Sequence, residues 1–220
     1  MSYVFDTIAV VDIIKGYMIL LQVFVLLLAV VIHEVAHGWV AYKCGDSTAR
    51  DMGRLTLNPI PHIDLNMTII MPIFIYIMSG GRAIFGGAKP VPINPNNFRN
   101  PKRDMILVSL AGCVANFLTA ILFALLIRLG IAKIIPAFTM LCMYGVLINI
   151  LLGVFNLIPI PPLDGSKVLM SVLPRRQMMS YLKFERFGII LVMLFFYFGF
   201  RFLYSNVIGP LASLMIGGVL

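Results

Sequence analysis

Residues 17–42 read YMILLQVFVLLLAVVIHEVAHGWVAY, and this stretch decides the fold. It is apolar over a length that exceeds the roughly 20 residues a helix needs to cross a bilayer. Its acidic and imidazole side chains are confined to His33, Glu34 and His37. Ionisable groups are costly inside a membrane, at about 2–3 kcal/mol or more each, so such groups usually serve a function. The stretch therefore predicts a transmembrane helix that carries a polar site.

The composition of the whole chain excludes an ordinary soluble domain. Of 220 residues, 60% are hydrophobic and 12% are charged, against about 45–50% and about 25% in soluble domains. The net charge of +8 does not indicate nucleic-acid binding, because the basic residues lie mostly in loops between apolar runs. Orientation in the bilayer and contact with anionic lipid explain them there. We predict a protein that sits in the lipid bilayer and binds no nucleic acid.

Three further apolar runs approach or exceed the length of a span. They cover residues 105–127, 138–158 and 187–204. A shorter run, 67–78, contains Pro72 and ends in Ser-Gly-Gly. We therefore predict an all-α polytopic membrane protein that is a single domain over residues 1–220. It should have about four full transmembrane helices, a re-entrant or short hairpin segment at 67–88, and an apolar C-terminal half-span at 205–220.

The string His33-Glu34-Val35-Ala36-His37 indicates a metal site. Helix positions four apart share a face, so both imidazoles can point at one ion. Glu34 then lies beside the first histidine, where it can act as general base toward a water at the metal. The alternative, a hydrogen-bonded polar cluster between helices, does not explain three ionisable groups within five residues of a membrane helix.

A catalytic zinc usually has a third protein ligand, and Asp164 is the strongest candidate among nine acidic residues. It follows the third span directly after a proline-rich break that unwinds the helix. Gly165 beside it would permit a close backbone approach. An Asp-Gly pair after prolines is often only a turn, but its combination with a membrane HExxH motif favours a ligand.

With these motifs in order, the chain resembles the site-2 protease family of intramembrane zinc metalloproteases. The resemblance rests on the HExxH string, on Asn156-Leu157-Ile158-Pro159 leading to Leu163-Asp164-Gly165, and on Leu110-Ala111-Gly112. The family usually has Pro where Cys113 stands and often Gly where Ser166 stands. No stretch is long enough for a PDZ or CBS domain, so the chain resembles the compact branch of the family.

The resemblance implies a zinc-dependent endopeptidase that cleaves within or near transmembrane segments of membrane proteins. It implies one Zn²⁺ per chain, with His33, His37 and Asp164 as ligands and Glu34 as the catalytic base. It further implies that Asn116 and Asn156 hold the substrate backbone or the oxyanion. His62, the one histidine outside the motif, is a candidate gate beside the site, although a histidine in a proline-bounded turn is commonly structural.

Metal geometry also predicts the topology. Asp164 can meet the two histidines only if the third span ends at the Lys43 face, so residues 67–78 must dip in and return. Thirteen of the 17 basic residues then lie on that face, against four on the other. By the positive-inside rule, the active site faces the cytoplasm, and we expect a multi-pass protein of the cell (plasma or inner) membrane.

Two other functions use the same residues. A non-proteolytic zinc-binding membrane protein or metal transporter would not need Glu34, and a transporter would usually show polar residues along several spans. A catalytically dead relative would be expected to lose Glu34 or a ligand. The protease interpretation requires a transmembrane protein substrate and allows a regulatory membrane partner, whose identities the sequence does not give.

Overall fold

The computed structural model describes residues 2–70, 74, 77 and 87–218. Its elements in chain order are helices of the α, 3-10 and π types: α1 (Ser2–Lys43), α2 (Thr48–Asp51), η1 (Ile60–His62), η2 (Leu65–Ile70), η3 (Pro95–Asn97), α4 (Pro101–Arg128), η4 (Ile131–Ile134), α5 (Pro136–Asn156), α6 (Asp164–Val172), α7 (Arg175–Glu185), α8 (Gly188–Leu203), η5 (Tyr204–Ile208) and α9 (Gly209–Ile216). The described residues contain no β-strand.

Four helical stretches are long and apolar enough to cross a membrane, which confirms the predicted all-α polytopic class. They are Gly16–Lys43, Pro101–Arg128, Pro136–Asn156 and Gly188–Ile216. Large apolar side chains such as Leu20, Phe24 and Leu118 are exposed on the surface of these helices. Such an apolar surface is suited to contact with lipid and not with water. The protein is a multi-pass membrane protein.

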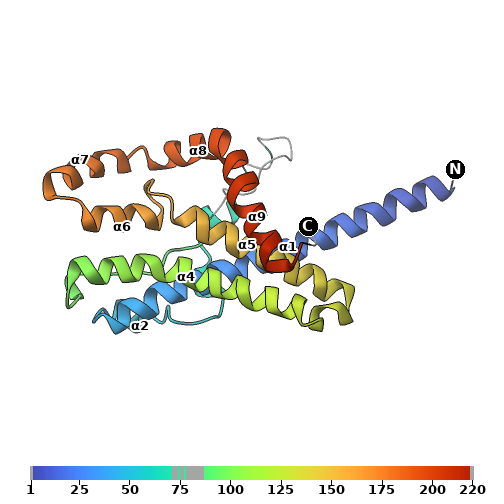
Figure 1. Ribbon diagram of the computed structural model, residues 1–220, viewed down its shortest axis with the longest axis horizontal. Helices are drawn as coiled ribbons and strands as arrows, with labels where there is room; N and C mark the ends of the chain where they lie inside the picture. The colour runs from blue at the N-terminus through green and yellow to red at the C-terminus, as the bar shows by residue number, and fades with distance from the viewer. Residues whose placement is uncertain (1, 71–73, 75–76, 78–86, 219–220) are drawn as a thin grey trace.

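Helix α4 is the centre of the bundle (Figure 1), with α1 and α5 packed against it and α6 lying along its N-terminal part. Close approach of α5 depends on a small residue, since a Cβ on Gly145 would lie 2.4 Å from the Phe123 ring. Small residues at such interfaces let membrane helices pack tightly. This contact sets how closely α5 lies against α4.

The connection between α1 and α4 leaves and returns at the same end of the bundle. The Arg99 backbone N–H donates to the Cys44 carbonyl at 3.1 Å, so the start of α4 lies beside the end of α1. This is the arrangement that the metal argument requires of the connection. The predicted re-entrant segment at 67–88 falls mainly on 71–73, 75–76 and 78–86, which lie outside the described residues.

The apolar C-terminal segment is helical and joins the fourth span. Helix α8 continues through the π-helix η5 into α9, so helical structure runs from Gly188 to Ile216. The Gly209-Pro210 pair, which predicts a break, lies at the start of α9. A proline in the first turn of a helix costs little, and the preceding π-turn absorbs the change in hydrogen bonding.

Candidate active site

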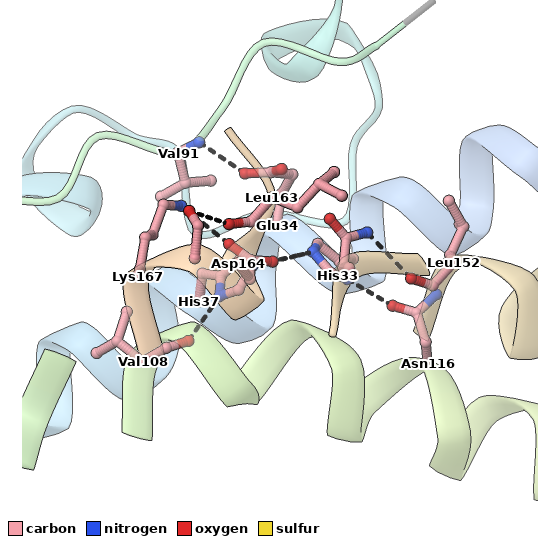
Figure 2. A network of polar contacts seen from close by, with 12 residues as sticks. His33, Glu34, His37, Val91, Val108, Asn116, Leu152, Leu163, Asp164 and Lys167 are labelled. Carbon is pink, nitrogen blue, oxygen red and sulfur yellow. Dashed lines mark hydrogen bonds and ion pairs between the residues drawn. The ribbon is translucent and has the colours of Figure 1, made fainter. Parts of the chain in front are cut away.

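Three candidate ligand atoms converge between α1 and α6 (Figure 2). The Nε2 atoms of His33 and His37 lie 3.0 Å apart, and each is 3.0 Å from Oδ2 of Asp164. All three side chains are buried. The histidines share one face of α1 because they are four residues apart. His33, His37 and Asp164 are the residues of the described part of the chain whose ligand atoms lie close enough together to hold one metal ion.

The turn before α6 brings Asp164 to the histidines. Helix α5 ends at Asn156, and the proline-rich turn leads to α6, whose first residue is Asp164. A Cβ on Gly165 would lie 2.2 Å from the Leu157 carbonyl oxygen. The position therefore requires glycine, as expected from the Asp-Gly pair, because only glycine allows this backbone approach.

A chain of hydrogen bonds fixes the tautomer of His33. The Asn149 amide donates to the Gly145 carbonyl at 2.8 Å, so its oxygen is left to accept from the Asn116 amide at 3.0 Å. The Asn116 oxygen in turn faces Nδ1 of His33 at 2.7 Å. Because a carbonyl can only accept, each donor in the series is determined. His33 must carry its proton on Nδ1, which leaves the Nε2 lone pair directed at the ligand cluster.

His37 has the same tautomer, because its Nδ1 lies 2.6 Å from the Val108 carbonyl and must donate to it. Neutral imidazoles in this state present two lone pairs beside the Asp164 carboxylate oxygen. Three electron-rich atoms at 3.0 Å repel one another unless a cation lies between them. Tetrahedral zinc separates nitrogen and oxygen ligands by roughly 3.3 Å. The donor set and its spacing therefore fit Zn²⁺.

Gly112 of α4 has no side chain and so leaves room for the imidazole rings of His33 and His37. A Cβ there would lie 2.5 Å from Cε1 of His33 and 2.6 Å from Nε2 of both histidines. No side chain fits at this position while the rings stay in place. The glycine of the Leu-Ala-Gly string is therefore required by the position of the two imidazole rings.

Lys167 holds the second oxygen of Asp164. Its Nζ donates to Oδ1 at 2.9 Å, which leaves Oδ2 for the ligand cluster. Burial raises the pKa of Asp164, whereas the ammonium of Lys167 lowers it and so favours the carboxylate. Sequence reasoning missed Lys167. Its signal is the three-residue spacing from Asp164, which places both side chains on one helix face.

Glu34 lies beside the cluster and not in it. Its Oε2 accepts the backbone N–H of Val91 at 2.8 Å, and the side chain is partly buried (Figure 2). Val91 belongs to an extended segment, residues 87–94, that precedes η3. The candidate base is therefore aimed by a backbone group from a different part of the chain.

Asp46 anchors the segment that carries Val91. Its buried carboxylate accepts the Asn94 backbone N–H at 2.7 Å, the Asn97 amide at 2.8 Å and the Thr48 hydroxyl at 2.5 Å. Burial raises the pKa of Asp46, but these hydrogen bonds outweigh it and lower the pKa from its ordinary value of 3.8.

We expect Asp46→Ala to lower the free energy of unfolding by roughly 2–4 kcal/mol, because it removes several charge-assisted hydrogen bonds. A folded-state pKa below 3.8 means that this stabilisation is present above pH 3.8 and is lost as the pH falls through the lowered pKa. Thermal unfolding in detergent from pH 7 downward should show the gap to wild type closing in acid. Asp51→Ala, which removes an exposed carboxylate, is the control, and an equal loss in both variants would contradict this role.

Asn116 lies behind His33 and is fully buried, with its amide oxygen on His33 and its amide nitrogen on Asn149. This position differs from the one expected of a residue that holds substrate. Asn156 ends α5, is half-buried, and donates to the Leu152 carbonyl at 3.0 Å. His62 is fully buried in its turn, with Nε2 bonded to the Thr56 carbonyl at 2.9 Å, and it is not among the converging ligands.

We expect Asn116→Ala to weaken zinc binding by about 10- to 100-fold, because His33 loses the acceptor that fixes its tautomer. Titration of the metal-free protein with Zn²⁺ against a competing chelator measures the dissociation constant. Asn206→Ala is the matched control, since Asn206 bonds to Phe202 and Ser205 of its own helical stretch. Unchanged affinity in Asn116→Ala would contradict the orienting role.

A hollow of about 230 Å³ opens beside His37. Its walls include Val91 and Ile93 of the extended segment, Val108 and Ser109 of α4, and Lys167. Because His37 is part of its wall, the hollow has room for a side chain next to the ligand cluster.

One known protein family matches most of this chain. The family model described as Peptidase family M50 matches residues 21–132 and 129–199. These ranges contain all three converging ligands and Glu34. Among solved structures, none matches this chain significantly.

Curated relatives carry related names. The chain is 36% identical over 181 residues to "Putative zinc metalloprotease YwhC" of Bacillus subtilis strain 168, covering 79% of this chain and 78% of that protein. It is 31% identical over 139 residues to "Putative zinc metalloprotease Rip2" of Mycolicibacterium smegmatis, covering 63% and 52%. The protein of the same name in Mycobacterium tuberculosis H37Rv is 27% identical over 170 residues, covering 77% and 64%.

Proposed function

Because this chain belongs to Peptidase family M50, the site-2 protease family, we propose that it hydrolyses peptide bonds within or near transmembrane segments of membrane proteins. It is a zinc-dependent intramembrane protease. The observation that carries the proposal is the convergence of two imidazole nitrogens and one carboxylate oxygen at 3.0 Å inside an apolar bundle. In this assignment His33, His37 and Asp164 hold one Zn²⁺.

Bound zinc supplies Lewis acidity, which polarises the scissile carbonyl and brings the pKa of water to about 7. Glu34 takes a proton from the attacking water and passes it to the departing amine. The Val91 N–H fixes the carboxylate of Glu34 for this step. Lys167 keeps Oδ1 of Asp164 occupied, so that the carboxylate offers a single oxygen to the metal.

The remaining polar residues divide between positioning and substrate contact. Asn116 orients His33 through its fully buried amide. Asn156, half-buried at the end of α5, holds the substrate backbone or the oxyanion. We assign the gating role to His62, the last residue of η1, whose carbonyl accepts the Lys89 N–H at 2.9 Å just before the segment that carries Val91.

The basic residues of the loops support a cytoplasmic active site in the cell membrane, since the Lys43 end of the bundle carries most of them. The whole chain then acts as one membrane-embedded metalloprotease domain. Its substrate is a transmembrane protein whose helix must unwind locally before its carbonyls can be attacked. A regulatory membrane partner would act by controlling that access.

Metal removal tests the function. We expect purified protein in detergent to contain about one zinc per chain by elemental analysis, and to cleave a transmembrane substrate. Dialysis against a chelator should abolish cleavage, and an equimolar addition of Zn²⁺ should restore it. Cleavage that persists in the metal-free protein would contradict a zinc protease. Full zinc occupancy without cleavage of any membrane substrate would instead support the zinc-binding or transport alternative.

A further inference from the structure

A second hollow, of about 450 Å³, lies between the start of α4, α6 and the start of α7. We call it the basic groove. Met105, Met170 and Met178 form much of its apolar wall, and Lys102, Lys167 and Arg175 supply its charges. Figure 1 shows α6 lying alongside the N-terminal part of α4, with α7 following from its far end.

The basic groove lies next to the hollow beside His37, because Met105 and Lys167 line both. Lys167 is also 2.9 Å from Asp164. An extended peptide advances about 3.3 Å per residue. A chain that leaves the metal centre along this wall therefore enters the basic groove within a few residues.

The charges of the groove have no complement in its wall. Among the described residues its lining contains three cations and no carboxylate, and one of the three, Lys167, is paired with Asp164 outside the lining. Lys102 and Arg175 are exposed, and neither forms an ion pair in the part of the chain that the structure describes. The complementary occupant is an apolar segment that carries negative charge, because opposite charge across an interface selects partners and accelerates encounter.

We propose that the basic groove binds the substrate segment flanking the cleaved bond and selects substrates with Asp or Glu in that segment. This inference rests on the proposed protease function. A peptide is favoured over a lipid headgroup because the groove shares Met105 and Lys167 with the hollow beside His37, so a substrate chain at the metal ligands lies next to it. The flexible methionines suit varied apolar side chains, so the acidic residue is the selective feature.

Charge-swap cleavage assays test the proposal. One transmembrane substrate is prepared with Glu, Gln or Lys at each of the positions flanking the cleaved bond on both sides. Wild-type protein should prefer Glu over Lys at one or two positions, by about fivefold per charge contacted. Lys102→Glu and Arg175→Glu should reverse that preference at the same positions. The preference should shrink as salt is raised.

Each variant has a neighbouring control. Arg103→Glu and Arg176→Glu make the same charge change one residue away, on exposed side chains outside the lining. Both should keep the wild-type preference, which separates local contact from net charge.

Three outcomes would overturn the proposal. Wild-type cleavage that is independent of substrate charge contradicts acidic selection while leaving the protease function intact. Equal changes in the groove and neighbour variants contradict a specific groove. A loss in the groove variants that is the same for all substrates, and that follows the anionic lipid content of vesicles, assigns the groove to lipid. If wild type cleaves no substrate at all, the proposed function itself fails.

Discussion

Glu34→Gln should leave zinc bound and reduce cleavage by about 10²- to 10⁴-fold, the usual contribution of a general base. Gln keeps the size of the side chain and an oxygen that can accept the Val91 N–H, so the local geometry is retained. What it removes is the carboxylate that accepts the proton of water. The measurement is the initial rate of cleavage in detergent, paired with elemental analysis of zinc in the same preparation.

Glu185→Gln is the matched control, because Glu185 is an exposed carboxylate at the end of α7. It should cleave at the wild-type rate. If Glu34→Gln retains both zinc and activity, Glu34 is not the base. If the Glu34→Gln variant loses zinc, Glu34 acts in metal binding, and its assignment as a base that lies outside the ligand set is wrong.

Gly112→Ala should abolish cleavage by weakening zinc binding at least about 100-fold, more than removal of an outer partner does. The added methyl would lie 2.5–2.6 Å from atoms of His33 and His37, so both rings must move apart. Zinc titration against a competing chelator measures the affinity. Helix propensity alone favours alanine over glycine by about 1 kcal/mol, so the loss should not come from an unfolded helix.

Gly16→Ala serves as its control, because a Cβ at Gly16 meets nothing within 4 Å. It should bind zinc and cleave as wild type does. Normal zinc affinity in Gly112→Ala would show that the imidazoles have room to shift, which the packing of α1 on α4 does not indicate. A folded protein without zinc is the expected state.

Sequence alone could predict the spans and the ligand candidates because each follows from a strong local signal. A membrane helix is recognised by its apolar length, and His33 and His37 by their spacing on it. Asp164 could be predicted because few acids exist and one follows a proline-rich break. The family assignment rested on the same residues and agrees with the match to Peptidase family M50.

Partners across helices could not be predicted, because they depend on how each helix is rotated against its neighbours. The Asn116–Asn149 bond depends on the close approach of α5 to α4, which Gly145 allows. The Val91–Glu34 bond joins residues far apart in the chain through a segment without regular structure. The helical connection from α8 to α9 could not be predicted either, because a Gly-Pro pair indicates a break in sequence but fits the first turn of α9.

The residues around the metal centre come from four different helices. The histidines come from α1 and the aspartate from α6, while α4 and α5 supply the hydrogen bonds that set the His33 tautomer. Metal uptake therefore requires that all of these helices have assembled, since a partial bundle lacks a ligand or presents the wrong nitrogen. A newly inserted chain would therefore have no proteolytic activity toward other membrane proteins until its own folding is complete. Assembly of the helices would in this way activate the protease.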